Sequence, residues 1–253
     1  MMLLRLYNSL KMIYQNLSTP SKVEFQRFSK SDYLPHSHPK FATNAIHAGQ
    51  EPESVHGSIN VPIHLSSTFA QHDIGKLYSN FDYSRCGNPT RSAFETCMAS
   101  LEYGKHAIAF SSGCGGLTSI MHLIKSGEHV IICDDVYGGT QRYLRLFSEG
   151  KYGVEVQFVD MTNSDNIKNA IKENTRLIWV ETPTNPTLKL IDLEAVAKLG
   201  KEHKILTVAD NTFANPYLQS PLLLGIDITI NSCTKYLGGH SDLVMGVVVL
   251  NDK

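Results

Sequence analysis

The chain has 253 residues, of which 42% are hydrophobic and 19% are charged, and its formal net charge is −1. This composition is typical of a folded globular protein and excludes a disordered chain. The length fits one large domain or two small ones. The near-neutral charge gives no electrostatic footprint for nucleic acid or an anionic membrane, and no apolar run is long enough to cross a bilayer.

The five cysteines are odd in number and lack the paired spacing of a metal site or a disulfide framework. We interpret them as reduced thiols and expect a cytoplasmic protein without a bound metal. The first twenty residues contain Arg5 and Lys11 and no acid. A mitochondrial presequence is therefore an alternative to a loose extension at this end.

The N-terminal third lacks regular periodicity. Residues 1–40 are interpreted as an extension that ends in a proline- and histidine-rich run. Residues 41–90 are rich in Ser, Asn, Gly and Pro and carry too little apolar surface to fold alone. We expect them to form an irregular arm that wraps around another structure.

From residue 91 to residue 253, strand-like and helix-like patterns alternate. The expected strands are 106–110, 129–133, 154–159, 177–180, 204–209, 226–231 and 244–250. The expected helices are 93–101, 117–124, one through 143–147, 166–171 and 193–199. This alternation predicts an α/β fold with a mainly parallel central sheet flanked by helices. The chain stops just after a strand, so we expect that a C-terminal portion is missing from it.

Two of these strands end in chemically significant residues. Lys235 follows the strand 226–231, and the strand 204–209 runs directly into Asp210. In an open α/β sheet, ligands bind at the carboxyl ends of the strands. An ammonium and a carboxylate at that edge are the groups that pyridoxal 5′-phosphate (PLP) chemistry needs, because a lysine forms a Schiff base with the cofactor aldehyde and an acid keeps the ring nitrogen protonated. We expect the strand end to hold Lys235 partly out of water, which lowers the pKa of a lysine.

Three further strand ends supply the remaining contacts of such a cofactor. The run from Ser111 to Gly116 combines hydroxyls with glycines that let backbone N–H groups approach a phosphate. Tyr137 is placed to stack on a flat ring, and Asn185, in a proline-rich loop, to donate to a ring oxygen. Each feature alone has a plainer interpretation as a turn, a βα loop or a packing residue. Their coincidence at one sheet edge favours a PLP site.

The motifs resemble those of the Cys/Met-metabolism PLP enzymes of fold type I, the trans-sulfuration enzymes. The resemblance runs from about Phe41 to Lys253 and is carried by specific segments. They are Tyr83–Thr90, Asp135–Thr140, Glu181–Pro186, Asp210–Phe213, Thr234–Tyr236 and Gly238–Asp242.

The resemblance implies a role for each matching residue. Lys235 is the Schiff-base lysine and base, Asp210 the partner of the ring nitrogen, Tyr137 the stacking residue and a catalytic group, and Asn185 the donor to the ring oxygen. The phosphate is held by four residues, which are Gly113, Cys114, Ser232 and Thr234.

Tyr83 and Arg85 resemble the pair that reaches the phosphate of a neighbouring subunit. The arm would thus complete a partner's site. This implies at least a homodimer, and a tetramer is usual for the family. Two departures from the family pattern stand out: Cys114 replaces a more usual aliphatic residue, and the C-terminal domain with the arginine that binds the substrate carboxylate is not in the chain.

Within the family, Phe41–Gln50 and Gly138–Tyr143 are most similar to the eukaryotic γ-lyases. This implies γ-elimination of L-cystathionine to L-cysteine, 2-oxobutanoate and ammonia. The visible residues serve γ- and β-elimination equally, so a β-lyase or γ-synthase type of activity stays open. A truncated, inactive homologue that still binds PLP or a second subunit is an alternative of a different class.

Overall fold

The computed structural model describes residues 41–252. The extension and presequence interpretations concern residues 1–40 and lie outside this range. The described residues form a seven-stranded sheet in the order β3-β9-β8-β7-β6-β4-β5 and a small two-stranded ribbon. The sheet strands are β3 (His106–Phe110), β4 (His129–Cys133), β5 (Glu155–Val159), β6 (Thr175–Glu181), β7 (Leu206–Asp210), β8 (Ile228–Ser232) and β9 (Gly246–Leu250).

The sheet is parallel except for one strand. Strands β5, β4, β6, β7 and β8 pair in parallel, whereas β9 lies antiparallel between β8 and β3. The predicted α/β fold with a mainly parallel sheet is therefore confirmed, and each predicted strand is present within a few residues. The parallel strands end at one edge, so the residues that follow them are brought together.

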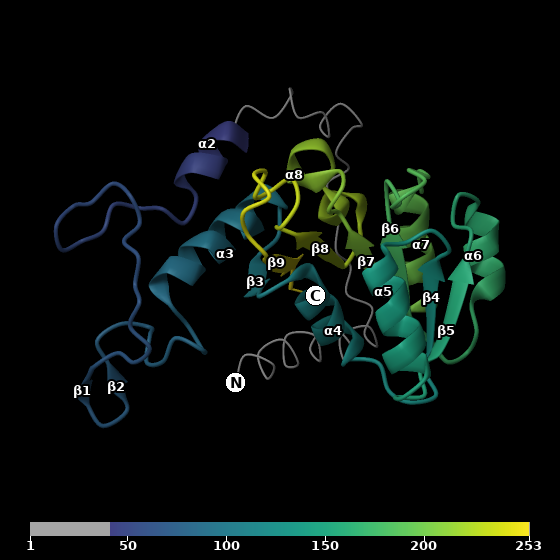
Figure 1. Cartoon of the computed structure of the whole chain (residues 1–253), viewed down its shortest axis with the longest axis horizontal. Coiled ribbons are helices and arrows are strands. Elements are labelled where there is room, and N and C mark those ends of the chain that lie inside the picture. Colours follow the sequence, from purple (N-terminus) through teal and green to yellow (C-terminus); the bar gives the residue numbers. More distant parts are fainter. Residues whose placement is uncertain (1–40, 253) are drawn as a thin grey trace.

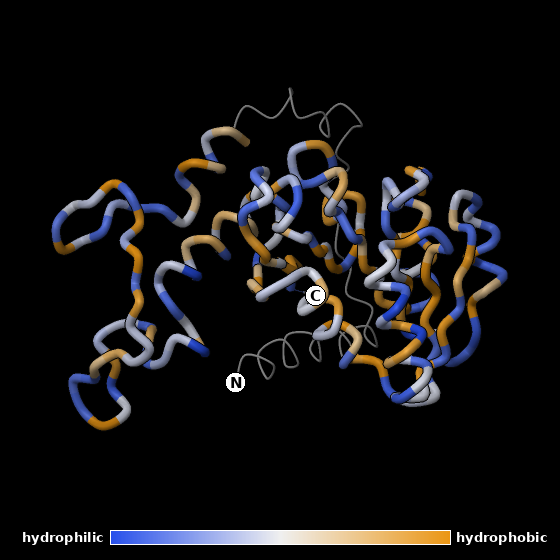
Figure 2. Tube along the Cα trace, in the orientation of Figure 1, coloured by the Kyte–Doolittle hydropathy of each residue, from blue (hydrophilic) through white to orange (hydrophobic). Residues whose placement is uncertain are grey.

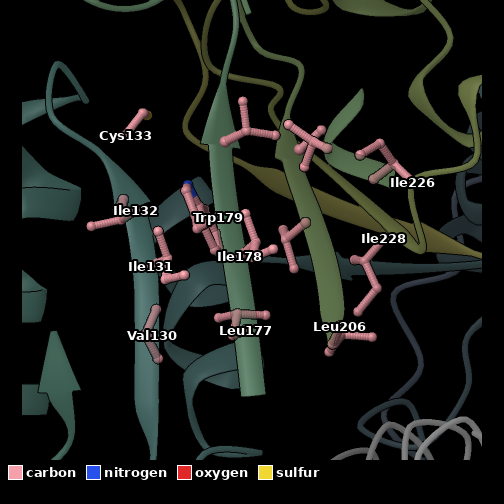
Figure 3. Close-up of a cluster of buried hydrophobic side chains, with 14 of the residues drawn as sticks. Val130, Ile131, Ile132, Cys133, Leu177, Ile178, Trp179, Leu206, Ile226 and Ile228 are labelled. Carbon is pink, nitrogen blue, oxygen red and sulfur yellow. The ribbon is translucent and has the colours of Figure 1, made fainter. Parts of the chain in front are cut away.

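The central strands are buried on both faces. Every residue of β4 and β9 is buried, and in β6, β7 and β8 only Arg176, Asp210 and Ser232 are partly open to solvent. Figure 3 shows buried side chains of β4, β6, β7 and β8. Continuous apolar runs of this kind are characteristic of a parallel sheet that helices cover on both faces, and Figure 2 shows the apolar stretches along the chain in orange.

Helices cover both faces of the sheet (Figure 1). Helix α4 packs on one face, where Leu117 meets the cluster that contains Val248, and α3 packs on the other, against Val247 and Val249. The helical segments are α2 (Phe41–His47), α3 (Pro89–Leu101), α4 (Gly113–Met121), α5 (Gly138–Tyr143), the π-helix η3 (Leu144–Glu149), α6 (Ser164–Ala170), α7 (Leu193–His203), α8 (Asn215–Leu218) and the 3₁₀ helix η4 (Pro221–Leu224).

Helices α3 and α4 begin four residues earlier than their apolar periodicity predicts. Helix α3 begins at Pro89, because the Asn88 side chain accepts hydrogen bonds from the backbone N–H groups of the next turn and so caps the helix. Helix α4 begins at Gly113 and is capped by Ser112. The glycines expected in a loop therefore belong to its first turn. A Cβ on Gly116 would lie 2.9 Å from Ile230 Cδ1, so glycine lets the helix approach the sheet closely.

Residues 41–88 form the arm. It contains α2 and the ribbon of β1 (Gln71–Asp73) and β2 (Lys76–Leu77), and it extends away from the sheet at the end where α3 lies (Figure 1). Many of its apolar side chains are in water, including Leu65, which is 91% exposed, and Ile74, which is 97% exposed. The irregular arm is confirmed, and its role as a separate unit that serves a neighbouring subunit stays a prediction.

The cysteines agree with the expectation of reduced thiols. All five lie within residues 41–252 and are free. No helix in this part of the chain is both long and apolar enough to cross a membrane.

Candidate active site

A cavity of about 290 Å³ opens at the carboxyl edge of the sheet. Its walls come from the ends of β6, β7 and β8 and from the N-termini of α4 and α5. Eight of the ten predicted cofactor residues line it, and two do not. The eight are Gly113, Cys114, Tyr137, Asn185, Asp210, Ser232, Thr234 and Lys235.

Asp210 ends β7 in the wall of this cavity. One carboxylate oxygen, Oδ1, accepts hydrogen bonds from Thr212 Oγ1 at 2.5 Å and Thr212 N at 3.0 Å. The second oxygen, Oδ2, has no hydrogen-bond partner among the described residues. Burial raises the pKa of Asp210 even though the two bonds from Thr212 oppose the shift. The site therefore presents an open carboxylate oxygen that a buried cation would stabilise.

Lys235 lies in the loop after β8 and lines a second, more open cavity of about 670 Å³ as well as the first. It is exposed, so the expectation that the strand end holds it partly out of water is wrong for this chain. The reason is that β8 ends at Ser232, and Lys235 stands on the turn that follows, which is closed by a bond from Lys235 N to Ser232 O at 3.1 Å. No carboxylate pairs with its ammonium among residues 41–252. Lys235 therefore borders both cavities.

The first turn of α4 forms an anion-binding cradle. Ser112 accepts the hydrogen bonds of the backbone N–H groups of Gly115 and Gly116, which leaves those of Gly113 and Cys114 without a protein acceptor in the described structure. A Cβ on Gly113 would lie 3.0 Å from Ser232 Cβ, and glycine keeps that space open. The hydroxyls of Ser232 and Thr234 add to the same cavity. This donor set matches a phosphate.

Tyr137 precedes α5, and its ring lies directly over Gly139. A Cβ on Gly139 would lie 2.4 Å from Tyr137 Cε1, so only glycine leaves room for the ring at this place. Tyr137 is 45% exposed and lines the cavity. The arrangement suits stacking on a flat ligand.

Asn185 lies in the loop after β6, in which the peptide bonds before Pro183 and Pro186 are cis. Asp135, which lies two residues before Tyr137 in the chain, accepts hydrogen bonds from Thr184 Oγ1 at 2.5 Å and from Thr187 N at 3.1 Å. These bonds tie the Asn185 loop to the loop that carries Tyr137.

Glu181 and Trp179 line the cavity, and sequence reasoning assigned neither of them a role. Both lie on β6, two residues apart and so on one face. Glu181 is the first residue of the motif that ends at Pro186, but only the strand register shows that it stands opposite Asp210 on β7. Burial, and then the charge of Asp210, raise the pKa of Glu181 to about 8. Trp179 is the single tryptophan of the chain, and its Nε1 is buried without a partner in the described structure.

Tyr83 and Arg85 do not line the cavity. They lie in the arm and contact each other: Arg85 Nη2 donates to the Tyr83 hydroxyl at 3.2 Å, and its guanidinium lies 5.2 Å from the centre of the tyrosine ring. The Tyr83 side chain is 38% exposed. Their contact with a neighbouring subunit's phosphate stays a prediction.

The residues of the cavity fit PLP as a group. The α4 cradle with Ser232 and Thr234 suits the phosphate, Asp210 Oδ2 suits a protonated ring nitrogen, and the Lys235 amine suits the aldehyde. Neither Asp210 nor Glu181 forms an ion pair among residues 41–252, so the charges of two neighbouring buried carboxyls are uncompensated by a protein cation there. The protonated pyridine ring of PLP would supply such a cation.

Comparison with known proteins agrees with this fit. The family model described as "Cys/Met metabolism PLP-dependent enzyme" matches residues 42–253. The chain is 51% identical over 213 residues to a probable cystathionine γ-synthase of Herpetosiphon aurantiacus, covering 84% of this chain and 66% of that protein. It is 51% identical over 213 residues to a cystathionine γ-lyase of Dictyostelium discoideum, covering 84% and 55%. It is 45% identical over 210 residues to a cystathionine β-lyase of Coxiella burnetii, covering 83% and 54%.

The chain thus spans between about half and two thirds of the length of these relatives. Their names specify three different reactions of cystathionine metabolism. The relatives therefore share one family but are named for different reactions.

The buried carboxyls predict how stability changes with pH in the cofactor-free protein. Burial raises the pKa of Glu181 to about 8 and that of Glu102, which accepts hydrogen bonds from Asn211 and Asn231, to about 7, both from a usual value of 4.5. Each group binds its proton more tightly in the folded than in the unfolded state. Its stabilising contribution is complete below about pH 4.5 and is lost as the pH rises through 7 to 8.

We therefore expect the free energy of unfolding, measured by urea denaturation, to fall by several kcal/mol between about pH 5 and pH 8.5. Glu181→Gln and Glu102→Gln should each flatten this dependence, because each variant removes one titrating group. A free energy that stays constant or rises over this pH range would contradict the burial of these acids.

Proposed function

Because the chain belongs to the family of Cys/Met metabolism PLP-dependent enzymes, we propose that it is a carbon–sulfur lyase that uses PLP to cleave L-cystathionine by γ-elimination. L-Cystathionine and water would give L-cysteine, 2-oxobutanoate and ammonia. One observation carries the PLP assignment: the open oxygen of Asp210, the amine of Lys235 and the anion cradle of α4 line one cavity.

The site residues have distinct tasks in this proposal. PLP, when bound, supplies an electron sink for the bond that breaks at the substrate's α-carbon. Asp210 would hold the ring nitrogen through Oδ2 and would favour its protonated form. The α4 N-terminus, with Ser232 and Thr234, holds the phosphate. Tyr137 would stack on the ring, and Asn185 would donate a hydrogen bond to the ring oxygen.

Lys235 has two tasks. Its amine would hold the cofactor through the aldehyde, and it would also serve as the base for the proton at the substrate's α-carbon. The place of Lys235 in the walls of both cavities supports both tasks, because the second, more open cavity gives a substrate access to this residue. Tyr137 is the second candidate for proton transfer.

The proposal of γ-elimination rather than β-elimination rests on the names of the chain's relatives. Two of the three relatives have names that specify a γ reaction, each at 51% identity, and the β-lyase is at 45%. The lining residues serve either reaction, since both begin by removing the α-proton. The finer assignment therefore needs a product measurement.

Lys235→Ala tests the PLP assignment. We expect the unsubstituted chain to bind PLP with a visible absorption band that dialysis does not remove, and the variant to lose that band, because no other amine lines the cavity among the described residues. Lys198→Ala is a matched control at an exposed lysine of α7. The PLP assignment fails if the variant retains the band of the parent chain.

Product analysis tests the reaction. With L-cystathionine as substrate, we expect 2-oxobutanoate and L-cysteine in equal amounts. Pyruvate with homocysteine would instead assign β-elimination and overturn the γ assignment while leaving the PLP assignment intact.

We also propose that Tyr83 and Arg85 complete the site of a second copy of the chain. The support is their absence from the chain's own cavity wall, their place in the uncovered arm and their mutual contact, which keeps the guanidinium beside the tyrosine hydroxyl. A guanidinium with a neighbouring hydroxyl is a phosphate-binding pair.

Complementation tests this sharing of residues. Arg85→Ala and Lys235→Ala should each bind PLP poorly, whereas co-expression of the two variants should restore tight binding at about a quarter of the sites, because half of the dimers formed at random carry one intact site. Co-expressed variants with no more tight binding than the separate variants would rule out a shared site.

A further inference from the structure

Glu181 joins two loops of the site through a single carboxylate. Its Oε2 accepts a hydrogen bond from Tyr137 N at 3.0 Å, and its Oε1 accepts one from Asn185 N at 2.7 Å. These two donors belong to the stacking residue and to the ring-oxygen donor, which come from loops that follow β4 and β6. Glu181 itself lies in the cavity wall.

The chemistry of these bonds favours a carboxylate. Each oxygen accepts one backbone N–H, and an ionised Asp or Glu offers two acceptor oxygens without a donor. An amide at this position would turn its NH₂ group toward one of the two N–H groups and would lose that bond. A shorter acid would lack the reach to hold both.

The burial of Glu181 beside a second acid argues that its carboxyl group has a specific role at this position. Glu181 is 5% exposed and stands opposite Asp210 across β6 and β7, where two carboxylates repel each other. A buried acid beside another acid destabilises the protein unless its hydrogen bonds or a cation compensate. The N–H groups of the two residues that would contact the cofactor offset part of this cost.

We propose that Glu181 is a positioning residue that sets the places of Tyr137 and Asn185 for PLP, an inference that rests on the proposed function. Both of its hydrogen bonds to these residues go to backbone N–H groups, so its effect passes through the backbone of the two loops. Asp135 holds the same loops together from another side, so the loops keep a second connection when Glu181 is changed.

The first test uses the cofactor-free protein at about pH 9, above the raised pKa of Glu181, and needs no activity. Amide hydrogen exchange at Tyr137 and Asn185 should be slow in the parent chain. Glu181→Gln should accelerate it about tenfold or more at one or both amides, as expected for loss of a bond to a charged acceptor. Glu95→Gln is the matched control, because Glu95 is a partly buried carboxylate that accepts a backbone N–H, that of Ala109, away from the cavity. It should leave both exchange rates unchanged.

The second test measures PLP affinity by quenching of the fluorescence of Trp179, the single tryptophan, which lies in the cavity wall. We expect Glu181→Gln to weaken PLP binding about tenfold or more and Glu95→Gln to bind as the parent does. Should Glu181→Gln not fold, Glu181→Asp replaces it in both tests, since it keeps the charge and shortens the side chain by one methylene.

The outcomes separate the two proposals. A parent chain that does not bind PLP would overturn the proposed function and with it this inference. A parent that binds PLP, together with a Glu181 variant of equal affinity and equal amide exchange, would overturn the inference alone. Faster exchange with unchanged affinity would also overturn it, because the loops would then be held for the fold and not for the cofactor.

Discussion

Two carboxyl groups stand side by side at the buried edge of the sheet, and the rest of the site is arranged around them. The register of β6 and β7 places Glu181 opposite Asp210, and burial penalises the charge of both. The two acids are nevertheless not equivalent. Both oxygens of Glu181 accept backbone N–H groups, whereas Asp210 has one oxygen with bonds from Thr212 and one without a partner among the described residues. A cation would be stabilised most strongly beside this unpartnered oxygen.

Glycine determines how closely the walls of the cavity approach one another. Gly116 lets α4 settle on β8 and β9, and Gly139 leaves room for the Tyr137 ring. Gly246, at the start of β9, lies against the loop before α4, since a Cβ there would lie 2.3 Å from Ser112 O. The anion cradle is therefore shaped in part by the antiparallel strand, which carries no residue of the predicted site. This explains why β9, although it departs from the parallel pattern, belongs to the site's architecture.

The strands could be predicted from local pattern, whereas the full set of eight cavity residues also depended on the resemblance of their motifs to those of the family. Apolar runs mark buried strands, and the residue after each parallel strand must lie at the common edge. The first residues of α3 and α4 could not be predicted from apolar periodicity, because capping by Asn88 and Ser112 determines where these helices begin. Glu181 was missed for a different reason. Its importance depends on its neighbour across the sheet and on two N–H groups from separate loops, and no local window of sequence contains that information.

Lys235 and the arm show a further limit of local pattern. The strand before Lys235 predicts a withdrawn amine, yet the lysine is exposed between an enclosed and an open cavity. A lysine can be withdrawn from water only by surfaces that close over it, and residues 41–252 of one chain supply no such cover. The arm, in turn, has apolar side chains in water and carries Tyr83 and Arg85 outside the cavity of its own chain. In a two-fold dimer of identical subunits, the arm of each chain would cover the open site of the other chain.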